Sequence, residues 1–257
     1  MSGKGNKRFQ VLAVNVSAVA PDDVVDNVKD MVRMRGRGCV HFCTVHTILE
    51  CVDNVRMAAI VNDSTMAVPD GMPLVWLGRR AYPAAGVQRC YGPDLMLAIC
   101  EAGIAMGMRH CFYGGTPDVL QKLHDNLEAR FPGIKIVEAI APPFRELTPE
   151  EHQDVEAKIN KAQPDIVWVG LGTPKQDLWM GQMRERLDAS VLIAVGAAFN
   201  FHAGLLAQAP RWMQRAGLEW LFRLCKEPRR LWKRYLLGNP RFLWLLMKQR
   251  WAKVPGS

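Results

Sequence analysis

The stretch DIVWVGLGTPKQDL, residues 165–178, decides the fold class of this chain. Its first half is a short run of apolar, β-branched residues, which is typical of a buried strand, and its second half enters a helical pattern. A second stretch, FYGGTPDVL at 112–120, has the same form. Between strand and helix, the two loops carry the residues Gly114, Gly115, Thr116, Gly170, Gly172 and Thr173.

Similar short apolar runs recur along the chain and alternate with helical patterns. The predicted strands are 10–16, 39–45, 65–68, 110–115, 134–140, 165–172 and 191–199. The predicted helices lie near 21–35, 47–62, 92–107, 117–131, 149–162 and 175–188. Threonine followed by proline at 116, 148 and 173 marks three helix starts. Regular alternation predicts an α/β Rossmann-like fold, a parallel sheet with helices on both faces.

Composition indicates a globular protein of the cytoplasm. The 257 residues are 49% hydrophobic, and seven cysteines include no CxxC pair, as expected of reduced thiols rather than a disulfide framework. No apolar leader precedes the first strand, and the late apolar run at 242–247 is too short to span a bilayer. We therefore expect neither secretion nor a transmembrane segment.

Charge divides the chain into a near-neutral body, 1–210, and a basic helical tail, 211–257. The tail holds twelve Lys or Arg against two Glu, and five of the eight tryptophans. Basic amphipathic helices with interfacial tryptophans bind anionic membranes, so we predict a peripheral membrane contact. The alternatives are a helix that packs on the body and a nucleic-acid arm. We expect the segment before Pro228 to close the active site and to bring Arg211, Arg215 and Arg223 to the substrate.

Ligands of such folds bind at the carboxyl ends of the strands. Glycine loops that open helices favour a diphosphate, although glycine and Thr-Pro also serve plain turns and caps. The loop at 170–175 lacks the third glycine of GxGxxG, and no P-loop occurs. No DxD motif occurs either, so we expect no metal and no cofactor. Cys39, His41 and Cys43 share one strand face and could in principle ligate zinc, but strand cysteines are usually buried hydrophobes.

Asp70 follows the run TMAVP at 65–69 and precedes Gly71. Such an Asp-Gly pair is commonly a turn, but at a strand end this carboxylate can also serve as a general base. Gln176 and Asn200 could bind sugar hydroxyls or be ordinary polar residues, and Arg89 could clamp an anion or be solvated. Gly196 lies where the last strand ends.

Several motifs in order resemble one known family. They are T-x-H at 44–46, VPDG at 68–71, Arg89 with YGPDL at 91–95, FYGG, VGLGTPKQDLW, GAAFNFHAG at 196–204 and the tail motif at 211–236. Together they resemble the WecG/TagA/CpsF glycosyltransferases, family 26, over nearly residues 9–236.

The resemblance implies inverting, metal-independent transfer of a sugar from a UDP-sugar to an undecaprenyl-diphosphate-linked saccharide at the cytoplasmic membrane face. It places the general base on Asp70 and substrate contacts on Thr44, His46, Arg89 and the stretch Lys175–Asp177. His46, Asp177 and Asn200 depart from the family's Asn, Glu and Asp, so the donor sugar stays open. The oligomeric state is open too. A nucleotide-binding Rossmann oxidoreductase and a nucleic-acid module are the alternatives.

Overall fold

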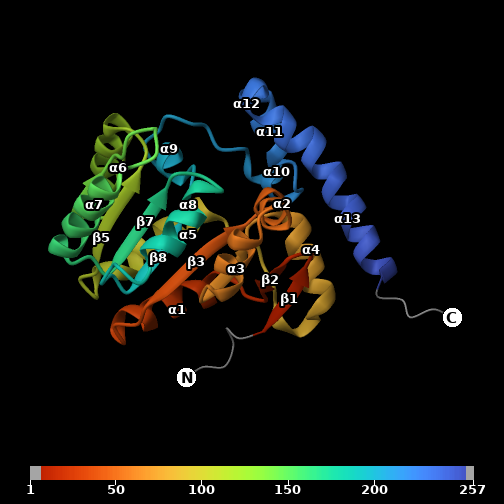
Figure 1. Cartoon of the computed structure of the whole chain (residues 1–257), viewed down its shortest axis with the longest axis horizontal. Helices are drawn as coiled ribbons and strands as arrows, with labels where there is room; N and C mark the ends of the chain where they lie inside the picture. The colour runs from red at the N-terminus through yellow and green to blue at the C-terminus, as the bar shows by residue number, and fades with distance from the viewer. Residues whose placement is uncertain (1–6, 253–257) are drawn as a thin grey trace.

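A six-stranded, all-parallel sheet forms the centre of the computed structural model, which describes residues 7–252 and the side chains of 7–249 (Figure 1). Its strand order is β4-β3-β8-β7-β5-β6. The strands are β3 (Gly38–Cys43), β4 (Met66–Pro69), β5 (Arg109–Gly114), β6 (Lys135–Ile140), β7 (Ile166–Gly170) and β8 (Val191–Ala194). The predicted α/β Rossmann-like class is therefore confirmed.

The first predicted strand, 10–16, is wrong as a member of this sheet. It is an antiparallel hairpin, β1 (Arg8–Val11) and β2 (Val14–Ser17), which turns at Leu12 with a positive φ of 53°. The hairpin's valines are buried in a cluster with α2, α3 and α4, because each short strand turns one apolar face inward. This cluster extends the core beyond β4.

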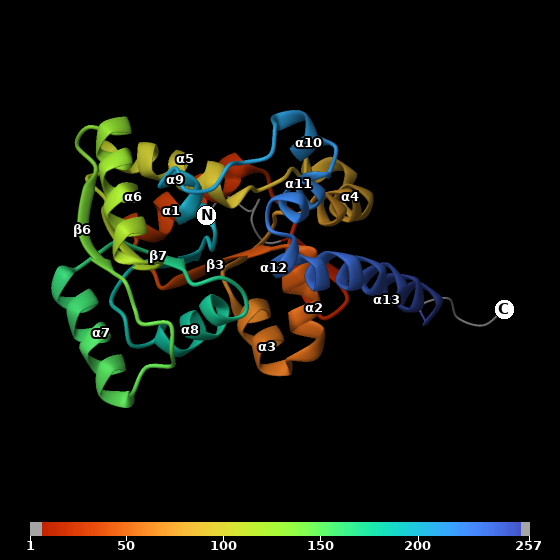
Figure 2. The ribbon, with the colours of Figure 1, turned by 90° about the horizontal axis from the view of Figure 1, so that it is seen from above.

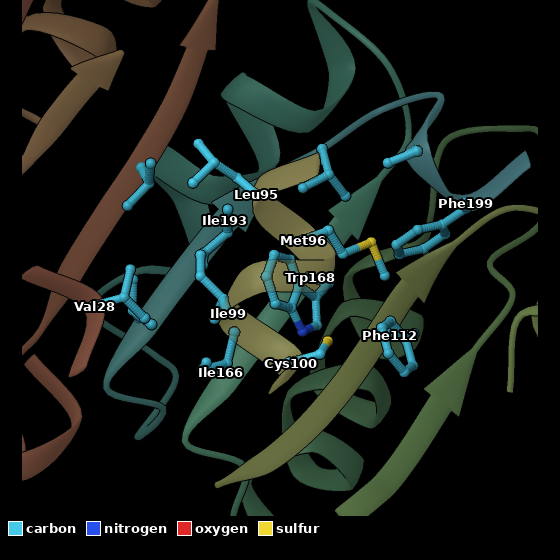
Figure 3. Close-up of a cluster of buried hydrophobic side chains, with 14 of the residues drawn as sticks. Val28, Leu95, Met96, Ile99, Cys100, Phe112, Ile166, Trp168, Ile193 and Phe199 are labelled. Atoms are coloured by element: carbon cyan, nitrogen blue, oxygen red, sulfur yellow. The ribbon is translucent and has the colours of Figure 1, made fainter. Parts of the chain in front are cut away.

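Helices cover both faces of the sheet (Figure 2). On one face lie α1 (Pro21–Arg33), α5 (Gly92–Ile104), α6 (Pro117–Arg130) and α9 (Ala198–His202); on the other lie α7 (Pro149–Ala162) and α8 (Lys175–Met183). Figure 3 shows the first face, where Leu95, Met96 and Ile99 of α5 surround the fully buried Trp168 of β7. Burial explains why β3, β4, β7 and β8 are nearly continuous apolar runs, whereas the edge strand β6 is only partly buried and carries charged residues.

The structure changes several of the predicted helices. The pattern at 47–62 is two helices, α2 (Val45–Asp53) and α3 (Val55–Asp63), because Asn54 caps the second through its side chain. An unpredicted helix, α4 (Met72–Ala81), follows Asp70, and a 3₁₀ turn, η1 (Pro83–Ala85), comes after it. Thr116 and Thr148 cap their helices as predicted, whereas Thr173 does not cap α8, whose N-cap is Pro174.

The described part of the tail is mostly helical, with short turns between its helices. It comprises α10 (Arg211–Arg215), α11 (Glu219–Lys226), α12 (Pro228–Trp232), a π-helical turn η2 (Lys233–Leu237) and α13 (Gly238–Ala252). In Figure 1, α11 and α12 lie above α10 and α2, and α13 runs outward along α2. Within residues 7–252, no helix combines the length and apolar character needed to cross a bilayer.

Candidate active site

Asp70 occupies the carboxyl edge of the sheet, directly after β4. Its backbone N–H donates to the carbonyl of Cys43 at 2.9 Å, which ties it to the end of β3. The strand order places the ends of β4, β3, β8 and β7 in one row, so Asp70, Thr44, Gly196 and Gly172 follow neighbouring strands. The side chain of Asp70 is only 15% exposed. A turn residue of the ordinary kind would be solvated.

Arg89 holds this carboxylate in place. Its Nε donates to the backbone oxygen of Asp70 at 2.5 Å, and its Nη2 lies 3.2 Å from Asp70 Oδ1. The same Nη2 lies 2.5 Å from Oε2 of Glu219, which α11 carries over from the tail. The guanidinium also stacks on the ring of Tyr91, 4.2 Å from the centroid. Arg89 is therefore buried and paired, which contradicts a solvated role.

Burial dominates the electrostatics of Asp70. It raises the pKa of this carboxyl from 3.8 to about 6, with Glu219 adding to the rise while Arg89 and Arg223 oppose it. A carboxylate with a pKa near the working pH is ionised often enough to accept a proton and basic enough to hold it.

A second polar cluster lies where β7 ends. Asp177 is buried on the first turn of α8; its Oδ2 accepts from the Thr173 hydroxyl at 2.8 Å, and its Oδ1 lies 2.7 Å from Nδ1 of His41. Burial alone lowers the pKa of His41, but the hydrogen bond and charge of Asp177 outweigh it and raise it to about 9. His41 and Asp177 thus form a buried hydrogen-bonded pair that fixes the Thr173 loop, and the raised pKa favours the charged imidazolium.

The zinc alternative is wrong for the described part of the chain. Within residues 7–252, no three His, Cys, Asp or Glu side chains gather as a metal-binding group. His41 faces Asp177, while Cys39 and Cys43 are buried in two different apolar clusters.

Gln176 is buried beneath the same loop rather than exposed. Its Oε1 accepts from the N–H of Gly172 at 3.0 Å, and its Nε2 lies 3.5 Å from Thr173 Oγ1. Gly196 lies against this amide. The amide thus holds the loop at the carboxyl edge of the sheet.

Thr44 and His46 lie between these two clusters. The Thr44 hydroxyl caps α2 by accepting from the N–H of Thr47 at 3.3 Å. Burial and the charge of Arg234 lower the pKa of His46 to about 4, although a backbone hydrogen bond at Thr173 opposes this. His46 is therefore neutral at pH 7. Arg234, from η2, has a buried Nε with no hydrogen-bond partner among the described residues.

The glycines differ in what they do. A Cβ on Gly114 would lie 2.6 Å from the backbone of Gly170, and one on Gly170 would lie 2.5 Å from the Phe199 ring. These two glycines let β5, β7 and α9 approach closely. Gly172, by contrast, has open space around it and a positive φ of 77°. Gly114 and Gly170 are therefore needed for close packing within the protein, whereas Gly172 leaves room for a ligand to approach the backbone.

The described motifs correspond to one family of enzymes. A family model described as Glycosyl transferase WecG/TagA/CpsF family matches residues 9–255. The chain belongs to this family. Nearly the whole chain is covered, including the tail, so this glycosyltransferase is an enzyme that transfers a sugar, and the oxidoreductase alternative falls away.

Not every predicted substrate residue of this WecG/TagA/CpsF glycosyltransferase lies in the buried clusters around Asp70 and Asp177. Lys175 and Arg215 are exposed, and Arg211 pairs with Asp94 at 2.7 Å on the surface. Asn200 is half-buried on α9, and Gly115 and Thr116 lie just before α6, with Thr116 as its N-cap. Arg223 lies over the ring of Phe201, 6.0 Å from its centroid, and its positive charge lowers the pKa of Asp70. Of the predicted tail arginines Arg211, Arg215 and Arg223, it is thus Arg223 whose charge affects the predicted base.

Sequence reasoning missed three residues of the site. Glu219 and Arg234 come from the tail, and Tyr91 supports Arg89. One signal was present for Glu219, because it is one of two acids among twelve basic residues of the tail. Nothing local distinguished Arg234 from its basic neighbours.

Proposed function

We propose that this glycosyltransferase moves a sugar, with inversion and without a metal, from a UDP-sugar to an undecaprenyl-diphosphate-linked saccharide in bacterial surface polysaccharide synthesis. The donor sugar would be N-acetylmannosamine, N-acetylmannosaminuronate or a hexose. Family membership supports the transferase class. The single observation that carries the proposal is a buried carboxylate, Asp70, at the carboxyl edge of the sheet with a pKa of about 6.

The proposed reaction assigns Asp70 one step. Its carboxylate takes the proton from the attacking hydroxyl of the acceptor, while the oxygen of that hydroxyl bonds to the anomeric carbon. The bond from this carbon to the diphosphate breaks on the opposite face, and UDP leaves with the electron pair. One carboxylate suffices for this chemistry, which is consistent with inversion.

Cations near Asp70 support a site for the leaving diphosphate. The guanidinium groups of Arg223 and Arg234 both interact electrostatically with the Asp70 carboxylate. The buried Nε of Arg234 has no hydrogen-bond partner among the described residues. Guanidinium groups stabilise phosphate oxygens through charge-assisted hydrogen bonds. With no DxD in the sequence, these arginines would take the place of a divalent cation.

The test is a panel of UDP-sugars with a short-chain polyprenyl-diphosphate sugar, read by mass spectrometry, for the wild type and Asp70→Asn. The variant should keep UDP binding but lose about 100-fold in turnover, the scale of a lost general base. EDTA should leave wild-type turnover unchanged. Turnover of Asp70→Asn at the wild-type rate with saturating acceptor would exclude the base role.

We propose in addition that the tail docks the enzyme on the cytoplasmic face of the membrane. The side chains of Leu243, Trp244 and Met247 on α13 are each at least half exposed, and Leu236 and Leu237 of η2 extend this surface. Lys248 covers the Trp244 ring, with its Nζ 4.0 Å from the centroid. Apolar side chains flanked by cations favour an anionic lipid surface. Arg250, Trp251 and Lys253 of the predicted tail lie outside the residues whose side chains are described.

Membrane docking is best tested by substitutions on the exposed face of α13 rather than by removal of this helix. Opposite the exposed face, Phe242 is buried against the hairpin cluster and Arg241 pairs with Asp53, so truncation after Gly238 would open the core. Replacing Leu243, Trp244 and Met247 by glutamine leaves those contacts intact. Sedimentation with anionic vesicles at low salt should then show weaker binding than for the wild type. Equal binding of wild type to anionic and neutral vesicles would contradict the proposal.

A further inference from the structure

Glu219 is an acidic residue of the basic tail that contacts Arg89, the arginine paired with the proposed base Asp70. It begins α11, 130 residues from Arg89, and its Oε2 lies 2.5 Å from Arg89 Nη2. Both side chains are largely buried, at 15% and 18% exposure. Low exposure strengthens a charge-assisted hydrogen bond because little water competes for either partner.

Glu219 and Asp70 share one guanidinium nitrogen unequally. The Arg89 Nη2 to Glu219 distance is 2.5 Å, whereas that to the Asp70 carboxylate is 3.2 Å. Arg89 cannot swing freely, since its Nε is bonded to the Asp70 backbone and its plane stacks on Tyr91. With Glu219 in place, Asp70 receives a single long contact instead of the bidentate pair that arginine and carboxylate prefer.

We propose that Glu219 is a positioning residue of this active site, which holds Arg89 away from full pairing with Asp70 and so keeps that carboxylate free to accept a proton. This inference rests on the proposed function, in which Asp70 is the base. It makes the base dependent on the docking of α11, because the tail supplies the second carboxylate.

The groups that face Asp70 agree with this role. Arg89 and Arg223 lower its pKa, Glu219 raises it, and Arg234 of η2 also acts on its charge. The other titratable groups beside it are thiols and a phenol whose pKa values burial raises, so they are neutral at pH 7: Cys43, Cys90 and Tyr91. Among these neighbours, Glu219 is the acid that offsets the arginines.

A titration of Asp70 tests this without any substrate. Carboxyl carbons of ¹³C-labelled aspartate are followed by NMR against pH, and Asp70→Asn identifies the Asp70 signal. Glu219→Gln should lower the Asp70 midpoint by about 1 unit, the scale of one neighbouring charge. Glu219→Asp, with a shorter reach, should give a midpoint between those of Glu219→Gln and the wild type. If Glu219→Gln does not fold, Glu219→Asp decides, and a midpoint at or above the wild-type value overturns the proposal.

The matched control is Asp53→Asn, which breaks a different ion pair between tail and body. Asp53 accepts from both terminal nitrogens of Arg241 at 2.5 and 2.6 Å, on the surface and away from Arg89. In Asp53→Asn, the titration midpoint of Asp70 should equal that of the wild type. An unmoved midpoint in Glu219→Gln, or the same shift in Asp53→Asn, would show that Glu219 only docks the tail.

Kinetics then separate this inference from the proposed function. In Glu219→Gln the acid limb of the turnover profile should move to lower pH with a lower plateau, while the KM for the UDP-sugar is unchanged. A lower plateau with an unmoved limb overturns the positioning role. If the wild type transfers no sugar from any UDP donor, the proposed function fails, whereas the NMR midpoints still report on Glu219.

Discussion

Asp70→Asn should stabilise the protein while it removes turnover. The pKa of Asp70 in the fold is about 6 against 3.8 for the free side chain. Because one pKa unit corresponds to about 1.4 kcal/mol, the ionised carboxylate costs the fold about 3 kcal/mol at pH 7.5. Low exposure of the side chain, 15%, means that solvent screens little of this cost. The asparagine amide keeps the shape without the charge, and Arg89 keeps Glu219 as its partner.

The pH dependence of this gain is specific. Between about pH 4 and pH 6 the folded protein holds the Asp70 proton while the unfolded chain has released it, so the contribution of this group to stability falls as pH rises. Above about pH 6 the full cost remains. The advantage of Asp70→Asn should therefore be about 3 kcal/mol at pH 7.5 and about half of that at pH 5.

Urea unfolding at pH 5 and pH 7.5, followed by circular dichroism, measures this directly. Asp26→Asn on α1 is the control, because Asp26 is 70% exposed and should change stability little at either pH. The argument from burial fails if Asp70→Asn is less stable than the wild type, or if the two proteins are equally stable at both pH values. Either result would mean that ionised Asp70 does not destabilise the fold.

Three further outcomes follow from the same contacts. Wild-type turnover should fall about tenfold from pH 7 to pH 5, because the proposed base, Asp70, must be ionised and its pKa is about 6; a flat pH profile would contradict this. Asp177→Asn should cost about 3–5 kcal/mol in urea unfolding, since it leaves the buried His41 cation unpaired, and a negligible loss would mean that His41 is neutral. Gly170→Ala should cost about 1–3 kcal/mol by calorimetry, because its Cβ would lie 2.5 Å from the Phe199 ring, and unchanged stability would refute that contact.

Local patterns were sufficient for most of the secondary structure. Apolar runs predicted the six sheet strands, most of which are buried on both faces, and threonine before proline at 148 predicted the start of α7, where Thr148 and Glu151 form a capping box. The hairpin at 8–17 was missed because seven mostly apolar residues can be one strand or two, and only packing against α4 and β4 selects the turn.

The candidate site divides in the same way. Asp70 was predicted because it ends a strand within a recognisable motif, and its position at the carboxyl edge of the sheet agrees with this. Gln176 was expected to be an ordinary exposed residue or a sugar ligand, but it is buried and holds its own loop. Burial depends on what other segments cover, which residue type and spacing do not encode.

The sequence by itself determined the α/β class, the strand ends that line the candidate active site, and a tail that is basic and rich in tryptophan. Only the tertiary structure decided that Phe242 faces the core while Trp244 faces out, and that Glu219 meets Arg89. The reason is physical. Periodicity and capping act over a few residues, whereas the charge that sets a pKa acts across space, between groups that here are 130 and 19 residues apart.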